Sequence, residues 1–436
     1  MRIRPLPLAV LGGMLVPGLM AMTVFGKNAK STRVRATAAL PTAGDWPWWR
    51  GPALDGKSTD RHVVTTWGPH KNVLWKTKVP GRGHSSPIVC GNCVFLTTAE
   101  EEAQEQRVLA FDRKTGRPLW STLAHKGGFL AKNAKNSQAS ATPACDGERV
   151  YSAFINRDGL HVTATDLLGK IVWQAKAGAF TSEHGYGSSP VLSGSLVIVD
   201  GDSMEDSFLA ALDRRSGKVV WRTDRKTTGR HGSYATPVVA RLAGKPQLIM
   251  TGMGEVTSYD PATGKRLWWC QGPAEVTACT AACSDTLVFA TGGFPEKAIL
   301  AIRADGTGDV TESHVVWRTN KGVTYVPSPL HNDGCLYVVA DDGVATCFQA
   351  ATGKQVWQHR LAGAFTSSPV LVGDLLLATN ESGKTFVLRT GQKFKLVAAN
   401  ELDGGILATP AVCGGQIFIR TDHDLYCIGR PSGAKE

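Results

Sequence analysis

The sequence carries little charge, and after residue 25 it contains no hydrophobic run long enough to cross a membrane. Only 19% of its 436 residues are Asp, Glu, Lys or Arg and 42% are hydrophobic, a globular composition that excludes general disorder. No collagen-like or heptad pattern is present, so fibrous and coiled-coil architectures are excluded as well. The 48 glycines and 12 tryptophans, together with frequent Val and Thr, favour an all-β chain of short strands and tight turns.

Basic residues are not clustered in the globular part of the chain. The formal net charge is +11, but residues 1–38 hold six Lys and Arg and no acidic residue. The remainder has 42 basic and 37 acidic residues, without a basic run. Because nucleic-acid-binding proteins concentrate positive charge on one face or element, we expect no nucleic-acid partner.

The first 38 residues have the pattern of an export leader. Arg2 and Arg4 precede an uncharged apolar stretch over residues 6–25. This pattern predicts a signal peptide or, because about 20 apolar residues just span a bilayer, an uncleaved N-terminal membrane anchor. We therefore expect an exported protein of the periplasm or cell envelope. No Cys precedes Cys90, so lipid attachment at an early cysteine is not expected.

The ten cysteines form no redox or metal motif. There is no Cys-x-x-Cys-His sequence for covalent haem, and the Cys and His spacings fit no zinc site. Cys90, Cys145, Cys283 and Cys413 recur near the ends of repeated strands, where small buried hydrophobic residues are expected. Cys90 and Cys93 flank a Gly-Asn turn, so a disulfide across that hairpin is an alternative.

A first landmark, two small residues followed by Pro and an apolar strand, defines eight repeats spaced 40 to 56 residues apart. The copies are Ser85-Ser86-Pro87, Ala141-Thr142-Pro143, Ser188-Ser189-Pro190, Ala235-Thr236-Pro237, Ser328-Pro329, Ser367-Ser368-Pro369, Ala408-Thr409-Pro410 and a degenerate copy with Ala281 in the Pro place.

A second landmark is the turn Asp-x-x-Thr/Ser-Gly followed by x-x-x-Trp. Asp caps such a turn by accepting backbone NH groups, and Gly takes the positive φ that closes it. Each Trp falls on an outer strand, where a large ring can fill the gap between neighbouring sheets. The expected docking tryptophans are Trp75, Trp120, Trp173, Trp221, Trp268, Trp317 and Trp357.

The phase of the two landmarks predicts how the chain closes. Trp75 precedes the first strand start and has no repeat of its own, whereas the last repeat ends near Cys427 without an outer strand. The segment around Trp75 should therefore complete the last sheet and remove the open edges. We predict an all-β fold: an eight-bladed β-propeller with four-stranded blades and N-terminal strand closure, over residues 72–430.

The turn sequence Ala110-x-Asp112-x-x-Thr115-Gly116-x-x-x-Trp120 and its copies resemble the tryptophan-docking motif of pyrroloquinoline-quinone (PQQ) repeat propellers. That family includes quinoprotein alcohol dehydrogenases and the outer-membrane assembly factor BamB, and the motif is structural in all of them. The resemblance therefore implies the fold without choosing a function. The Trp-rich lead segment, residues 39–71, is similar over 45–52 to the start of many exported PQQ-repeat proteins, and we expect its tryptophans to fasten it to the propeller.

Quinoprotein dehydrogenases hold PQQ with calcium and a catalytic Asp, and those of the alcohol-dehydrogenase type add a disulfide between adjacent cysteines. This chain has no Cys-Cys pair, so we expect no catalytic residue and no cofactor, with PQQ and calcium disfavoured. The acidic stretch over residues 200–206 lacks the ligand spacing of a calcium loop, and we interpret it as a solvated loop. No metal site is predicted.

Connections from an outer Trp strand to the next inner strand all emerge at one end of a propeller. They contain histidines and tyrosines suited to binding a ligand at the funnel mouth: His84, His184, Tyr186, His231, Tyr234 and Tyr325. The longest connection, between Lys126 and Ser140, adds Lys132, Lys135 and two asparagines. The alternative is that these side chains only bond to neighbouring loops at the rim.

These observations favour a non-catalytic binding or scaffold protein of the bacterial cell envelope, possibly BamB-like in outer-membrane assembly. The alternative is a PQQ-dependent dehydrogenase or a carbohydrate-active enzyme that uses the funnel. We expect a monomer whose partner is an envelope protein or a glycan, and membrane contact only through an uncleaved leader.

Overall fold

The computed structural model describes residues 42, 44–157, 159–204, 206–225 and 231–430. The leader predicted over residues 1–38 lies outside them. All the regular elements in the described part are strands, and no helix there could span a membrane.

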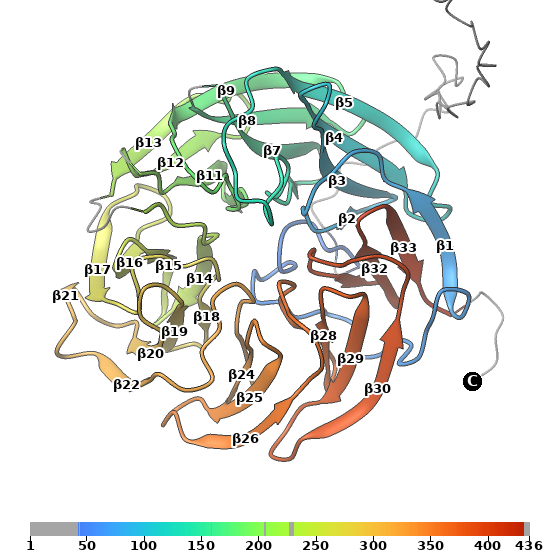
Figure 1. Ribbon diagram of the computed structural model, residues 1–436. Coiled ribbons are helices and arrows are strands. Elements are labelled where there is room, and N and C mark those ends of the chain that lie inside the picture. The colour runs from blue at the N-terminus through green and yellow to red at the C-terminus, as the bar shows by residue number, and fades with distance from the viewer. Residues whose placement is uncertain (1–41, 43, 158, 205, 226–230, 431–436) are drawn as a thin grey trace, which may run out of the picture. The chain divides into compact units, whose positions relative to one another are not determined.

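The strands form eight sheets arranged around a ring (Figure 1), and we number these blades from the first complete repeat. Blade 1 contains β2 (Ile88–Cys90), β3 (Cys93–Glu100), β4 (Glu105–Asp112) and β5 (Pro118–Lys126); blade 2, β6 (Ala144–Cys145), β7 (Arg149–Asn156), β8 (Gly159–Asp166) and β9 (Ile171–Ala179); blade 3, β10 (Val191–Ser193), β11 (Leu196–Gly201), β12 (Phe208–Asp213) and β13 (Val219–Asp224); blade 4, β14 (Val238–Leu242), β15 (Lys245–Gly252), β16 (Glu255–Tyr259) and β17 (Arg266–Gln271). Blade 5 contains β18 (Ala282–Cys283), β19 (Leu287–Gly292), β20 (Ala298–Arg303) and β22 (Val315–Thr319); blade 6, β23 (Leu330–Asn332), β24 (Cys335–Val339), β25 (Val344–Gln349) and β26 (Gln355–Arg360); blade 7, β27 (Val370–Val372), β28 (Leu375–Thr379), β29 (Lys384–Arg389) and β30 (Lys395–Glu401); blade 8, β31 (Ala411–Cys413), β32 (Gln416–Arg420), β33 (Asp424–Ile428) and β1 (Val73–Lys78).

Blade 8 is built from both ends of the propeller. Strand β1 pairs antiparallel with β33, so that Trp75 lies opposite Cys427 and Lys78 opposite Asp424. The two strands lie side by side in Figure 1 although about 350 residues separate them. The predicted eight-bladed fold with N-terminal strand closure is confirmed.

The residue just before each strand-start Pro forms a hydrogen-bonded ring around the axis. The backbone NH of Ser86 donates to Thr142 Oγ1 at 2.8 Å, and Thr409 NH closes the ring by donating to Ser86 Oγ at 3.0 Å. Seven of the eight steps have this form, and in the eighth Thr280 Oγ1 donates to the Thr236 carbonyl. We call these residues the axial ring: Ser86, Thr142, Ser189, Thr236, Thr280, Ser328, Ser368 and Thr409.

At the outer edge, tryptophans join six of the eight blades to the next one. The Trp75 indole lies on Gly116 of blade 1, where an added Cβ would come within 2.5 Å of the ring, so only Gly allows the approach. Trp75 Nε1 also donates to the Arg113 carbonyl at 2.9 Å. Five other tryptophans donate in the same way to the following blade: Trp120, Trp173, Trp221, Trp317 and Trp357.

Trp268 differs from the other docking tryptophans. Its Nε1 donates to Gln247 Oε1 on β15 of its own blade, at 2.8 Å, and the side chain is fully buried. Blade 5 lacks the Asp-x-x-Thr-Gly turn, and its insertion contains the short strand β21 (Gly308–Asp309), which pairs in parallel with Trp268 and Trp269. The insertion covers the outer edge of blade 4, so Trp268 packs within its blade and beneath that insertion.

The lead segment crosses the axis on the far side of the axial ring. Trp46 pairs with Val89, the Cys145 NH donates to Pro47 O, and Ser58 donates to the backbone carbonyls of Leu371 and Val412. Each of these four strand residues lies three positions after an axial-ring residue. The lead segment therefore packs under the ring.

The ten cysteines are all free thiols. Cys90 and Cys93 lie opposite each other across the β2–β3 hairpin, but they are not bonded to each other. Nine of the ten are buried, so they pack as small apolar residues.

Strand closure can be tested by deletion. Removing residues 72–79 should expose the edge of β33 and remove the Trp75 contacts, so we expect the melting temperature, followed by circular dichroism, to fall by roughly 10 °C or more. A deletion variant that melts with the parent would contradict closure.

Candidate functional site

A cavity of about 500 Å³ lies on the propeller axis, on the opposite side of the axial ring from most of the lead segment. Six axial-ring hydroxyl residues line it, and so does the residue two positions before every ring residue. These residues lie just before the inner strands, and both sets line the axial cavity. The second set consists of His84, Ser140, Gly187, Tyr234, Ala278, Val326, Thr366 and Leu407. Trp49 of the lead segment also lines the cavity and forms its floor.

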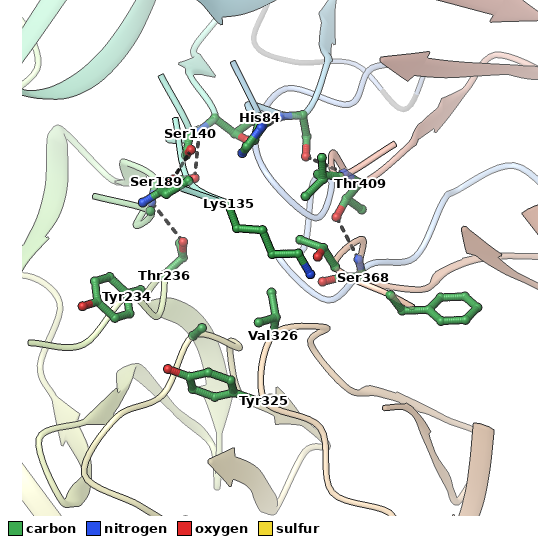
Figure 2. A pocket seen from close by; sticks show the side chains of 18 of the residues that line it. His84, Lys135, Ser140, Ser189, Tyr234, Thr236, Tyr325, Val326, Ser368 and Thr409 are labelled. Carbon is green, nitrogen blue, oxygen red and sulfur yellow. Dashed lines mark hydrogen bonds between the residues drawn. The ribbon is translucent and has the colours of Figure 1, made fainter. Parts of the chain in front are cut away.

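Four of the six predicted ligand-binding residues line this cavity: His84, His184, Tyr234 and Tyr325. Figure 2 shows His84, Tyr234 and Tyr325 around the cavity, from blades 1, 4 and 6. The His184 ring is exposed and lies near the Tyr234 ring, with 6.3 Å between centroids. These rings give one side of the mouth an aromatic wall.

Tyr186 and His231 do not line the cavity. Tyr186 is buried in blade 3, where its hydroxyl donates to Asp200 O at 2.9 Å and its ring packs edge-on against Phe180. His231 packs edge-on against Phe294, away from the axis. Tyr186 lies three positions before its ring residue, and its side chain packs into the blade core.

Lys135 is the lysine of the long blade 1 to blade 2 connection that reaches the cavity. Its Nζ lies 2.7 Å from Glu381 Oε1 of blade 7, so the pair bridges the mouth, and Figure 2 shows the lysine extending across it. Lys132 and Lys126 instead pair with Glu101 and Glu105 of blade 1. Asn133 and Asn136 also line the cavity.

Two carboxylates at the cavity were not anticipated from the sequence. Asp341 accepts the backbone NH groups of Tyr325 and Val326, at 2.7 and 3.0 Å. Glu381 accepts from Thr366 Oγ1 at 2.7 Å in addition to Lys135. Both lie in turns between the second and third strands of blades 6 and 7. Each carboxylate is engaged by neighbouring donors, which hold it at the wall.

The first part of the acidic stretch over residues 200–206 is not the solvated loop that we expected, whereas Asp206 is exposed and residue 205 lies outside the described residues. Asp200 and Asp202 are buried, and Asp202 makes a two-point ion pair with Arg225 at 2.6 and 3.1 Å. Burial and the neighbouring Asp202 raise the pKa of Asp200 well above its usual range. This pair ties the β11–β12 connection to blade 3 and does not line the axial cavity.

His84 is held in its neutral form. Burial, together with the positive charges of Arg420, Arg82 and Lys132, lowers its pKa to about 3. Such a weakly basic imidazole is a poor general base at neutral pH, but it still offers one donor and one acceptor to a ligand.

The residues present do not fit a calcium-bound quinone. No group of three or more His, Cys, Asp or Glu capable of holding a metal ion is found within the described ranges. The two cavity carboxylates are already engaged, and the sequence has no adjacent cysteines.

The eight blades, their indole-to-carbonyl joints and the axial cavity define a PQQ-like repeat propeller. A family model described as outer membrane protein assembly factor BamB matches residues 56–179, 104–359 and 269–393, and the chain belongs to this family.

Individual relatives are distant and carry different activities. Tetrathionate hydrolase from Acidithiobacillus ferrooxidans is 22% identical over 71% of this chain and 51% of its own length. BamB from Legionella pneumophila is 24% identical over 45% of this chain and 52% of its own length. The chain thus spans about half the length of these curated relatives. The structure of quinohemoprotein alcohol dehydrogenase from Comamonas testosteroni is similar in fold, with a TM-score of 0.63, 13% identity, and coverage of 92% of this chain and 83% of that one.

The protonation state of His84 predicts a dependence of stability on pH. The folded pKa is about 3 and the unfolded value about 6.5, so the unfolded chain takes up the proton first and stability falls as pH drops below about 6.5. Between pH 6.5 and 5 this costs about 2 kcal/mol. A His84→Gln variant should lose correspondingly less stability over this range in urea unfolding. Equal losses in the two proteins would mean that His84 is not held neutral.

Proposed function

We propose that this chain is a non-catalytic binding protein of the bacterial cell envelope, in which the propeller acts as a rigid scaffold. One observation carries the proposal: the axial cavity has an aromatic mouth, and among the described residues that line it no catalytic group is assembled. The family supports an envelope scaffold, and the leader pattern supports export to the periplasm or envelope.

The chemistry of the lining favours binding over catalysis. A general base needs a pKa near the working pH, and that of His84 is about 3. Asp341 and Glu381 are occupied by backbone, hydroxyl and ammonium donors. The tyrosine and histidine rings instead offer flat faces and hydrogen-bonding edges, which suit a glycan or a segment of an envelope protein.

The experiment compares one cavity histidine with one that lies outside it. Immobilised parent chain is used to capture partners from a cell-envelope extract, alongside His184→Ala, Tyr234→Ala and His231→Ala variants. We expect the partner to be retained by the parent and by His231→Ala, and retention to fall at least about tenfold for the two cavity variants. All four proteins should show the same circular dichroism. A partner held equally by all four would place its site away from the cavity.

A second candidate function is PQQ-dependent oxidation, because the fold is shared with a quinohemoprotein alcohol dehydrogenase. Supplying the purified chain with PQQ and calcium should give no dye reduction with alcohols or sugars, since the cavity lacks free carboxylates and adjacent cysteines. Substrate-dependent dye reduction above a no-protein control would establish the enzyme instead.

A further inference from the structure

The axial ring leaves a set of unused hydroxyl donors at the cavity. Each of the six lining hydroxyl oxygens accepts a backbone NH from the preceding blade, at 2.8 to 3.1 Å. None of the six donates its own proton to an acceptor within the described part of the chain. A hydroxyl has one proton to give, and a lining position directs it toward the axis. The six residues are Ser86, Thr142, Ser189, Thr236, Ser368 and Thr409.

Two buried guanidinium groups contact segments next to the axial ring, although neither lines the cavity. Arg420 is 2% exposed, and its Nη1 donates to Ser85 O, Ser85 Oγ and Thr97 O, next to cavity residues His84 and Ser86. Its Nε has no partner, and no carboxylate of the described chain forms an ion pair with it. Burial lowers the pKa of Arg420 to about 9, with only partial compensation from Asp422.

Arg50 repeats this situation at the floor. It follows Trp49 in the chain, is 1% exposed and donates through Nη2 to the backbone carbonyls of Asp55 and Pro329. Nε and Nη1 have no partner, and burial lowers its pKa to about 10. A buried cation without a paired anion is costly, so an anionic group nearby would offset both charges.

From these groups we infer that the ring end of the cavity binds a carboxylate on a small ligand. The inference rests on the proposed binding function and names the ligand class of that same site. Oxygen acceptors match the hydroxyl donors that line the cavity, and the charge of Arg420, which acts on the cavity residue His84, favours a negative charge there. A cation could face the same hydroxyl oxygens, but the charge of Arg420 opposes it. Asp341 and Glu381 do not compete as acceptors, because their own donors hold them at the wall.

The test uses two carboxylate sources, each with a neutral match, in isothermal titration calorimetry on the full chain. D-glucuronate is compared with D-glucose, and N-acetyl-D-alanyl-D-alanine with its C-terminal amide. We expect at least one acid to bind about tenfold or more tighter than its match. The pair that responds distinguishes a sugar acid from a peptide carboxylate. Equal binding within both pairs, or none, overturns the inference.

The axial ring supplies a matched pair of variants. Ser189 and Ser328 each accept one backbone NH at 3.0 Å, but only Ser189 lines the cavity. Ser189→Ala and Ser328→Ala should therefore lower the melting temperature equally. Only Ser189→Ala should lower the affinity for the acid, by about fivefold to tenfold. Ser189→Thr retains a hydroxyl and should keep the affinity. Equal weakening by both alanine variants would overturn the inference.

Failure here is distinct from failure of the proposed function. If a partner is captured in a His184-dependent manner but the chain shows no preference for acids, the proposed binding function is supported and the inferred carboxylate site is rejected. If capture is unaffected by His184 and Tyr234 but the acid preference and the Ser189 effect are present, the carboxylate site stands and the envelope partner binds elsewhere.

Discussion

Eight separate sheets become one ring through a single repeated contact, the backbone NH of one axial Ser or Thr donating to the hydroxyl of the next. A blade buries its faces only against its neighbours, so every interface needs a fixed angle. The axial ring fixes the inner end of that angle, and the indole-to-carbonyl joint on the outer strand fixes the outer end. Both joints are present at six of the eight interfaces, and β1 closes the ring by pairing with β33.

The same contact shapes the site. Because each of the six lining hydroxyl oxygens accepts a neighbouring NH, its own proton remains available to a ligand on the axis. The lead segment then closes the far side, since its contacts fall three residues beyond the ring on four blades and bring Trp49 to the floor. The residues that hold the blades together thus also line the proposed binding surface. A substitution of a ring residue that lines the cavity should therefore change both the stability of the fold and the affinity for a ligand.

The fold could be predicted because the contacts between blades are encoded by short contiguous motifs. At the inner strand the motif is a small residue, then Ser or Thr, then Pro. At the outer strand it is Asp-x-x-Thr-Gly followed by Trp. The site was predicted less well because nearness to a strand start does not say which way a side chain points. Counting two positions back from the ring residue would have selected His84 and Tyr234, but it would have missed Tyr325, which lies three positions back, as Tyr186 does, and still lines the cavity. Asp341 and Glu381 occupy the same turn of two neighbouring repeats, but the strand-start landmark alone does not show that this turn reaches the cavity.

A repeat protein must break its own symmetry to bind one ligand in one orientation. The axial ring is nearly uniform, so it supplies similar donors all round and little discrimination. The set two residues earlier ranges from Gly187 to Tyr234 and His84, and it places aromatic rings on only part of the wall. The long connection after blade 1 adds Lys135, which reaches across the mouth to Glu381 of blade 7. In the proposed site, specificity would therefore come from this second set and the long connection, whereas the ring would contribute affinity that any suitably placed acceptor shares.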